Sequence, residues 1–413
     1  MPARLADAPR LTRSHRAILV LAWAGWVFDF YDLFVYSWLV TAVQGDLGLT
    51  AGEARLVMSF SLAATAIGGA FFGYVSDRFG RKCALQWSIL AYSAGAALCG
   101  LSFSFESLAF FRCLTGLGVG GEWAVGHALI AETFPKERRG HYGALMQTGA
   151  PVGVGLSALV GGLVAPAIGW RATFLASGVS AVLVAAVRRS LPESDVWLEH
   201  RRSIERGDLP VAKASRFRRL FSRELRSVTA AAFVLTLFNM SAYWIAFTWM
   251  PGFLKGRHGL DLYRSVVPML VIVCGELLGY GFFGLVSDRI GRKLAFSIFA
   301  TVFAAGLLLV TLAFDALAAE PLLLYAALAV TGIGTGTWSS FGPFFSELYP
   351  TSLRTFGVST VFNLARGIQF AAPLLADAKR PGTIALGAAF SLLAAAWVWT
   401  LPETRGREIA ASE

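Results

Sequence analysis

Apolar stretches of roughly 20 residues, the length that an α-helix needs to cross a bilayer, recur throughout this chain of 413 residues. Hydrophobic residues make up 56% of the chain, charged residues make up 15%, and the mean hydropathy is +0.60. A soluble multidomain enzyme would need more polar surface than this. The sequence therefore predicts an all-α membrane protein with twelve transmembrane helices. These spans are expected near residues 17–40, 54–75, 83–103, 107–130, 141–166, 171–188, 228–251, 265–287, 294–313, 321–345, 355–376 and 382–401.

The basic residues are distributed unequally between the two sides that this pattern defines. Of the 36 Lys and Arg residues, 27 fall in the loops on the side of both termini and seven in the loops of the other side. The positive-inside rule then predicts a multi-pass protein of the cell (inner) membrane with both termini in the cytoplasm. The net charge of +10 reflects this topology, so nucleic acid is not an expected partner.

A ten-residue pattern, Gly-x-Val-Ser-Asp-Arg-x-Gly-Arg-Lys, occurs twice, as Gly73–Lys82 and as Gly284–Lys293, at an offset of 211 positions. Both copies lie between two predicted spans. Two shorter echoes follow, Glu-x-x-Pro at 132–135 and 347–350 and Leu-Pro-Glu at 191–193 and 401–403. Three echoes at similar offsets indicate an internal duplication.

The duplication predicts two pseudo-symmetric six-helix bundles, at residues 17–188 and 228–401. A cytoplasmic linker at 189–227 would join them, with a cytoplasmic arm at 1–16 and a cytoplasmic tail at 402–413. Paired six-helix halves that rock around a site near the bilayer midplane are typical of secondary transporters. We expect such a protein to function as a monomer within the lipid bilayer.

The repeated string Gly-x-x-x-Asp-Arg-x-Gly-Arg-Lys resembles the signature loop of the major facilitator superfamily. Arg112-x-x-x-Gly116-x-Gly118-x-Gly120-Gly121 resembles the second motif of that superfamily. The resemblance covers essentially the whole chain and implies the major facilitator fold. It also implies that an ion-pair set at the cytoplasmic end latches the outward-open state. The alternative is that these basic residues serve topology only.

The residues expected in this cytoplasmic gate come from the two loops and from the ends of the fourth and tenth spans. They are Gly73, Asp77, Arg78, Gly80, Arg81, Lys82 and Glu132, with a weaker mirror of Asp288, Arg289, Arg292 and Glu347.

Two further patterns bear on the substrate. The first span reads Gly-x-x-x-Asp-Phe-Tyr-Asp-x-x-x-Tyr from Gly25 to Tyr36, and the fourth holds Gly-Gly-Glu122-Trp. Together they look like the metabolite:proton symporters, which carry organic acids and zwitterions, although those proteins usually have Glu in place of Asp29. The Gly-Gly-Glu-Trp form is also similar to sialate and lactate proton symporters. Arg366 with Pro373 seven residues on is similar to organic anion transporters, where the arginine helps to recognise anions.

Acidic residues inside the spans are candidates for proton coupling, because a buried charge in a membrane is costly unless it is paired or hydrated. Spacings of three and seven residues place Asp29, Asp32 and Tyr36 on one stripe of the first span, which we expect to face water. The alternative is that these acids only brace a buried ion pair. The full set of proton-coupling candidates is Asp29, Asp32, Glu122 and Glu276.

Two arginines inside the spans, Arg112 and Arg366, are candidates for binding a carboxylate. Asp32 and Arg112 have similar expected depths, so a pair between them is plausible. Arg366 and Glu276 both lie about 18 Å from an end of their spans, so Arg366 is either a substrate anchor or a permanent partner of Glu276. Aromatic and amide side chains would complete the pocket, namely Tyr31, Asn239, Tyr243, Trp244, Trp338 and Asn363.

The sequence therefore favours proton-coupled symport of an organic carboxylate by alternating access, with protons and a small organic anion as partners. The alternatives are a proton-coupled exporter of drugs or other organic compounds, a sugar porter, and a receptor or scaffold. An enzyme is not expected, because no set of nucleophile and base and no phosphate-binding loop occurs. Neither cofactor nor metal is expected, because the four cysteines lack CxxC or metal-ligand spacing.

Overall fold

The structure is a computed structural model that describes residues 12–135, 139–189, 191–208, 216–258, 266–369 and 382–406. The predicted arm, linker, eleventh span and tail therefore lie partly outside the described residues. Over the described ranges the regular structure is helical, and no strand occurs within them. The first four predicted spans are continuous helices, α1 (Arg13–Leu47), α2 (Ala51–Phe79), α3 (Arg81–Cys99) and α4 (Phe105–Thr133).

The fifth and sixth spans are formed by helices that follow one another closely. They are α5 (Arg139–Gln147), α6 (Gly149–Leu159), a π-helical turn (Val160–Val164) and α7 (Ala165–Arg188). The chain reverses direction within α7 at Gly169, whose φ of 82° is a conformation that other residues rarely adopt. The predicted boundary between the spans at 166 and 171 contains this glycine.

The linker carries two short helices, α8 (Asp195–Glu205) and α9 (Arg216–Leu220). The remaining spans begin with α10 (Arg226–His258), α11 (Val266–Ile290) and α12 (Arg292–Leu312), followed by a short α13 (Phe314–Ala318). The tenth span is broken into α14 (Pro321–Gly334), a 3₁₀ turn (Thr335–Ser340) and α15 (Phe341–Leu348). The last spans contain α16 (Arg354–Ile368) and α18 (Gly382–Trp397).

Among the described residues, seven helices are long and apolar enough by themselves to cross a membrane. Of the other predicted spans, the third and fourth are the continuous helices α3 and α4, and the eleventh extends beyond the described residues. The twelve-helix architecture is thus consistent with the structure.

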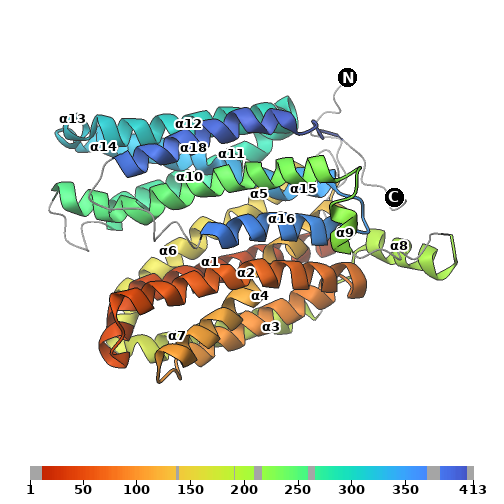
Figure 1. Ribbon diagram of the computed structural model, residues 1–413, viewed down its shortest axis with the longest axis horizontal. Coiled ribbons are helices and arrows are strands. Elements are labelled where there is room, and N and C mark those ends of the chain that lie inside the picture. Colours follow the sequence, from red (N-terminus) through yellow and green to blue (C-terminus); the bar gives the residue numbers. More distant parts are fainter. Residues whose placement is uncertain are drawn as a thin grey trace.

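We refer to residues 12–189 as the first half and to residues 216–406 as the second half. In Figure 1 helices α10, α11, α12, α14 and α18 form one layer, and α1, α2, α3, α4 and α7 form another. Two pairs of helices make the largest contacts between the halves. Helix α16 of the second half lies on α2, and α5 of the first half lies on α11.

Small residues allow these two cross-half contacts. A Cβ atom at Gly73 of α2 would lie 2.9 Å from the Cα of Phe356 on α16. A Cβ atom at Gly284, the equivalent position of the second loop, would lie 2.6 Å from the Cβ of Ala144 on α5. The first glycine of the repeated string is therefore a packing residue that lets the halves approach.

The two repeated loops also have the same backbone conformation. Gly80 separates α2 from α3 with a φ of 106°, and Gly291 separates α11 from α12 with a φ of 103°. Both loops lie at the same end of the bundle, which we call the loop end. The start of α1 is there too, because His15 Nε2 lies 2.9 Å from the backbone oxygen of Thr133, at the end of α4.

Candidate functional site

A buried ion-pair network holds the loop end of the first half. Arg81 Nη1 donates to Asp77 Oδ1 at 2.8 Å, and its Nη2 and Nε donate to the two carboxylate oxygens of Glu132 at 2.8 and 3.1 Å. The side chains of these three residues are at most 1% exposed. The structure thus brings together the charges that the repeated string and the end of the fourth span were predicted to contribute.

The same network reaches across to the second half. Arg354 Nη1 at the start of α16 donates to Glu132 Oε1 at 2.7 Å. The backbone N–H of Phe356 donates to Asp77 Oδ2 at 2.9 Å. Asp77 therefore caps the N-terminus of a helix in the other half, where a carboxylate also interacts favourably with the helix dipole.

The second loop repeats this arrangement with the roles of the two halves exchanged. Arg292 Nη1 donates to Asp288, and Arg292 Nη2 donates to Glu347 Oε1 at 3.1 Å. The backbone N–H of His141, in the first turn of α5, donates to Asp288 Oδ2 at 2.9 Å. Each half therefore caps one helix of the other half.

The Leu-Pro-Glu echoes complete both networks. Glu193 accepts hydrogen bonds from the backbone N–H groups of Arg81 and Lys82 at 2.9 and 3.1 Å. Glu403 accepts from those of Arg292 and Lys293 at 3.0 and 3.1 Å. Burial raises the pKa of Glu403, but these N–H donors outweigh burial and hold the pKa below its ordinary value. Its stabilising contribution is therefore present above the ordinary glutamate pKa and is lost as the pH falls through the lowered value.

Two of the predicted gate residues lie outside this network. Arg78 is exposed and lies over the ring of Phe79, with its guanidinium carbon 5.6 Å from the ring centroid. Arg289 is also exposed. These two exposed basic residues fit a role in orienting the protein in the membrane better than a role in the ion-pair network.

We expect Gly73→Val to disfavour this closed arrangement, because the added Cβ would meet the backbone of α16 at Phe356. Cysteine alkylation can measure this. Ser359 faces Gly73 and is fully buried. A cysteine placed at 359 in a cysteine-free background should therefore be alkylated at least tenfold faster when Gly73→Val is present than when Gly73 is kept. Gly45→Val is the matched control, because a Cβ there meets no atom within 4 Å. Equal alkylation rates in the two variants would contradict the assigned role of Gly73.

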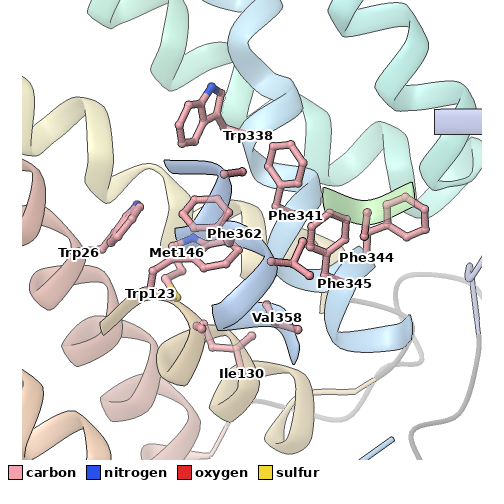
Figure 2. Close-up of a cluster of buried hydrophobic side chains, with 14 of the residues drawn as sticks. Trp26, Trp123, Ile130, Met146, Trp338, Phe341, Phe344, Phe345, Val358 and Phe362 are labelled. Atoms are coloured by element: carbon pink, nitrogen blue, oxygen red, sulfur yellow. The ribbon is translucent and has the colours of Figure 1, made fainter. Parts of the chain in front are cut away.

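The centre of the interface between the halves contains a closed ring of side chains, which we call the interface ring. Its members are Trp26, Trp123, Phe362, Trp338, Tyr243, Trp244, Phe34 and Phe30, and it closes at Arg366. Neighbouring ring centroids lie 3.6–6.3 Å apart. Trp123 stacks on Phe362 at 3.6 Å, and Phe34 stacks on Trp244 at 5.8 Å, and both stacks join the two halves. Figure 2 shows Phe362 over Trp123, between Trp26 and Trp338.

Apolar side chains separate the interface ring from the loop end. Ile130, Met146, Phe345 and Val358 are buried and belong to the same hydrophobic cluster as Trp123. Figure 2 shows this group beside the stacked pair of Trp123 and Phe362. Together with the ion pairs at the loop end, it closes that side of the interface.

Arg366 is the one cation of the interface ring. It is 1% exposed, and its guanidinium carbon lies 5.8 Å from the ring centroid of Trp26 and 5.6 Å from that of Phe30. Within the described residues, its Nη1 and Nη2 atoms have no hydrogen-bond partner. Its acidic neighbour is Asp29 of the first half, which acts on it electrostatically. Arg366 therefore does not pair with Glu276.

Other buried donors of the ring and its surroundings also lack an acceptor in the described part of the chain. They include the indole Nε1 of Trp26, the indole Nε1 of Trp244, the amide Nδ2 of Asn239 and the amide Nε2 of Gln147, whose Oε1 accepts from Trp123. Asn239 lies one turn before Tyr243 on α10 and is 2% exposed. A set of buried donors without acceptors suits a ligand that is rich in acceptor atoms.

Glu276 is linked to the ring through Tyr243, whose ring neighbours are Trp244 and Trp338 and not Arg366. It is 2% exposed on α11, and the hydroxyl of Tyr243 hydrogen-bonds its carboxyl group. Its Oε1 has no hydrogen-bond partner among the described residues. Among the predicted pocket residues, Tyr243, Trp244 and Trp338 belong to the ring.

Asp32 and Arg112 do lie together, but inside the first half. Arg112 Nη1 donates to the backbone oxygen of Asp32 at 2.9 Å, and Arg112 acts electrostatically on the Asp32 carboxylate. The guanidinium carbon of Arg112 lies 5.4 Å from the ring centroid of Tyr36. The predicted single stripe of α1 is thus divided, with Asp29 near Arg366 and Asp32 near Arg112.

Three more of the predicted site residues are used within the helix packing. Tyr31 hydrogen-bonds Ser177 of α7 at 2.6 Å, and Glu122 accepts from Ser88 of α3 at 3.5 Å. Asn363 donates to the backbone oxygen of Gly120 at 2.8 Å, which links α16 to α4. None of the three is a member of the interface ring.

The aromatic members that the first half contributes were not predicted from the sequence. Trp26 and Phe30 lie three residues before and one residue after Asp29, so they surround the acid that was singled out. Trp123 follows Glu122 in a quoted motif but was not assigned a role. Arg354 was missed as a gate residue, although it stands seven positions after Glu347 as Arg139 does after Glu132.

Known proteins resemble this chain along most of its length. The sialic acid transporter NanX of Escherichia coli is 30% identical over 87% of this chain and 86% of its own. A probable 4-methylmuconolactone transporter of Cupriavidus pinatubonensis is 29% identical over 93% of this chain and 90% of its own. The solved structure of the proton:xylose symporter XylE from Escherichia coli matches the fold with a TM-score of 0.77, at 21% identity, over 96% of this chain and 97% of that one.

The family model of the Major Facilitator Superfamily matches residues 21–368. That range contains both repeated loops, the interface ring and Arg366. The chain therefore belongs to the major facilitator superfamily, and it is an integral membrane transporter of organic compounds, not an enzyme.

Proposed function

We propose that this transporter is a proton-coupled symporter of organic carboxylates, with the loop end on the cytoplasmic side. The observation that carries the proposal is Arg366, a buried guanidinium between two aromatic faces with both Nη atoms lacking an acceptor. A guanidinium presents parallel N–H donors that fit the two oxygens of a carboxylate. The names of the relatives include an organic acid, which agrees with such a ligand.

The surroundings of Arg366 suit the rest of such a substrate. The indole N–H groups of Trp26 and Trp244 offer further donors, and the aromatic faces of the ring offer apolar contact. Specific sites for small molecules are mostly apolar with a few placed polar groups. The interface ring has this composition and takes side chains from both halves.

Charge balance provides the coupling to protons. Without substrate, the cation of Arg366 has the carboxylate of Asp29 as its acidic neighbour. A substrate carboxylate at Arg366 would place two anions beside one cation in an environment of low dielectric. Protonation of Asp29 removes one negative charge, so the proton and the anion bind together. Of the acids inside the spans, Asp29 is therefore assigned the coupling role.

Alternating access follows from the two cross-half contacts. In this structure the carboxylate of Asp77 on α2 caps α16, and the carboxylate of Asp288 on α11 caps α5. These two capping contacts hold the halves together at the loop end. Release of a substrate to the loop side requires those capping bonds and the Arg354–Glu132 pair to break. The basic residues at this end place it in the cytoplasm by the positive-inside rule.

We expect Asp29→Asn to reduce proton-driven accumulation of a transported carboxylate at least tenfold, while exchange of internal for external carboxylate continues. Asparagine imitates the protonated acid, so the anion binds Arg366 without a proton. Both rates can be measured in proteoliposomes with a labelled carboxylate. Asp46→Asn is the control, because Asp46 is half exposed and pairs with Arg171 away from the ring. Accumulation by Asp29→Asn at the level of the unmodified protein would refute the role of Asp29.

A further inference from the structure

Glu276 is a buried acid whose partners leave one of its oxygens unused. It is 2% exposed, and its Oε1 has no hydrogen-bond partner among the described residues. The same described residues contain no Lys or Arg in an ion pair with it. Tyr243 fixes the carboxyl group by a hydrogen bond, so the unused oxygen has a defined position.

Tyr243 connects this acid to the interface ring at a place remote from Arg366. Around the ring, Trp26, Trp123, Phe362 and Trp338 lie between Arg366 and Tyr243 on one path. Phe30, Phe34 and Trp244 lie between them on the other path. In the order of contacts around the ring, at least three side chains therefore stand between the anion-binding donors and Tyr243, which holds the unused acceptor.

We propose that Glu276 determines specificity by accepting a hydrogen bond from a hydroxyl group at the end of the substrate remote from its carboxylate. The inference rests on the proposed function, since it takes Arg366 as the site of the carboxylate. The substrates of this site would be flat, ring-containing hydroxy acids.

The groups around Glu276 favour a hydroxyl over an ammonium group. A hydroxyl both donates and accepts, whereas an ammonium only donates. Near Tyr243, the Nε1 of Trp244 and the Nδ2 of Asn239 are buried donors without an acceptor in the described part of the chain. One hydroxyl can donate to Glu276 Oε1 and accept from one of these donors, so it satisfies both kinds of unused atom.

The body of the substrate is inferred from the walls of the ring. Trp26, Phe30, Phe34, Trp338 and Phe362 present aromatic carbon, and two of the cross-half contacts are parallel stacks. A flat ring can be stacked or met by the edges of such side chains. An aliphatic chain of the same length would gain less from these contacts.

The test uses the full-length protein in proteoliposomes with an inward proton gradient and three labelled probes of one shape. They are 4-hydroxybenzoate, 4-methoxybenzoate, which cannot donate, and benzoate, which lacks the second group. We expect the unmodified protein to take up 4-hydroxybenzoate at least tenfold more efficiently than the other two. Glu276→Ala should reduce this preference to within twofold, and Glu276→Gln, which keeps an acceptor oxygen, should retain most of it. Size-exclusion profiles identify any variant that fails to fold, and Glu276→Leu, which also lacks an acceptor oxygen, then replaces Glu276→Ala in the comparison.

The outcomes separate this inference from the proposed function. Uptake of all three acids at equal rates would overturn the role of Glu276 and leave carboxylate symport standing. A preference for the hydroxyl that survives in Glu276→Ala would assign that preference to another residue and also overturn the inference. Absence of uptake for all three acids would contradict both proposals.

Discussion

Replacing Arg366 with alanine is expected to reduce carboxylate uptake at least a hundredfold. Arg366 is the one cation of the interface ring, and both of its Nη atoms lack a hydrogen-bond partner in the described structure. Its loss removes a charge-assisted bidentate contact, and hydrogen bonds to charged groups contribute about 1.5–3 kcal/mol each. It also leaves Asp29 beside the site without its cation. Uptake of a labelled carboxylate by proteoliposomes measures the effect.

Arg366→Lys is the matched variant for this prediction. It keeps the positive charge but lacks the planar fork, so uptake should fall about tenfold and remain measurable. Size-exclusion profiles like those of the unmodified protein would show that both variants are folded. Undiminished transport by Arg366→Ala, with either a carboxylate or a neutral sugar, would show that the anion site lies elsewhere.

Replacing Glu132 with alanine is expected to have the largest effect on stability. Its carboxylate accepts hydrogen bonds from Arg81 and from Arg354, and it is fully buried between the halves. Alanine would leave two buried guanidinium groups short of their shared acceptor. Loss of one partner of a buried ion pair costs about 3–5 kcal/mol. Thermal unfolding of the purified protein in detergent measures this as a fall in Tm.

A control and a rescue variant isolate this effect. Glu106→Ala changes an exposed acid at the other end of the same helix and should leave Tm nearly unchanged. The double variant Glu132→Ala with Arg354→Ala removes one of the stranded cations and should recover part of the loss. A Tm for Glu132→Ala within one degree of the control would mean that the network does not hold the halves together.

The helices and the loop network follow closely from the sequence, because both depend on local patterns. Apolar runs of transmembrane length predicted the spans, and the repeated string predicted that Asp77, Arg81 and Glu132 would meet. The glycines of the string occupy positive φ at Gly80 and Gly291 and close packing at Gly73 and Gly284. Such constraints act within a few residues, so a single sequence records them.

The interface ring could not be predicted in the same way, because it depends on how two halves pack. Helical periodicity placed Asp29 and Asp32 on one stripe, since three residues turn a helix by about 300°. That leaves the two side chains about 60° apart, which is enough to direct one toward Arg366 and the other toward Arg112. Asn363 shows the same limit, because its side-chain amide donates a hydrogen bond to the backbone oxygen of Gly120 on another helix.

The two halves differ in one respect that bears on function. The loop network occurs in both halves, whereas the charges at the interface ring occur once. At the offset of 211 that relates the loops, Met240 corresponds to Asp29 and Thr65 corresponds to Glu276. The duplicated residues are therefore suited to closing the loop end, and the unduplicated ones are suited to recognising the substrate.

The most direct test of carboxylate–proton symport is the lumenal pH of proteoliposomes when a transported carboxylate is added outside without an imposed gradient. Symport predicts that the lumen acidifies as the labelled carboxylate enters, beyond the passive rate of liposomes that carry Arg366→Ala. A protonophore should abolish the acidification. Protein-dependent uptake without acidification, or with alkalinisation, would contradict the proposed coupling.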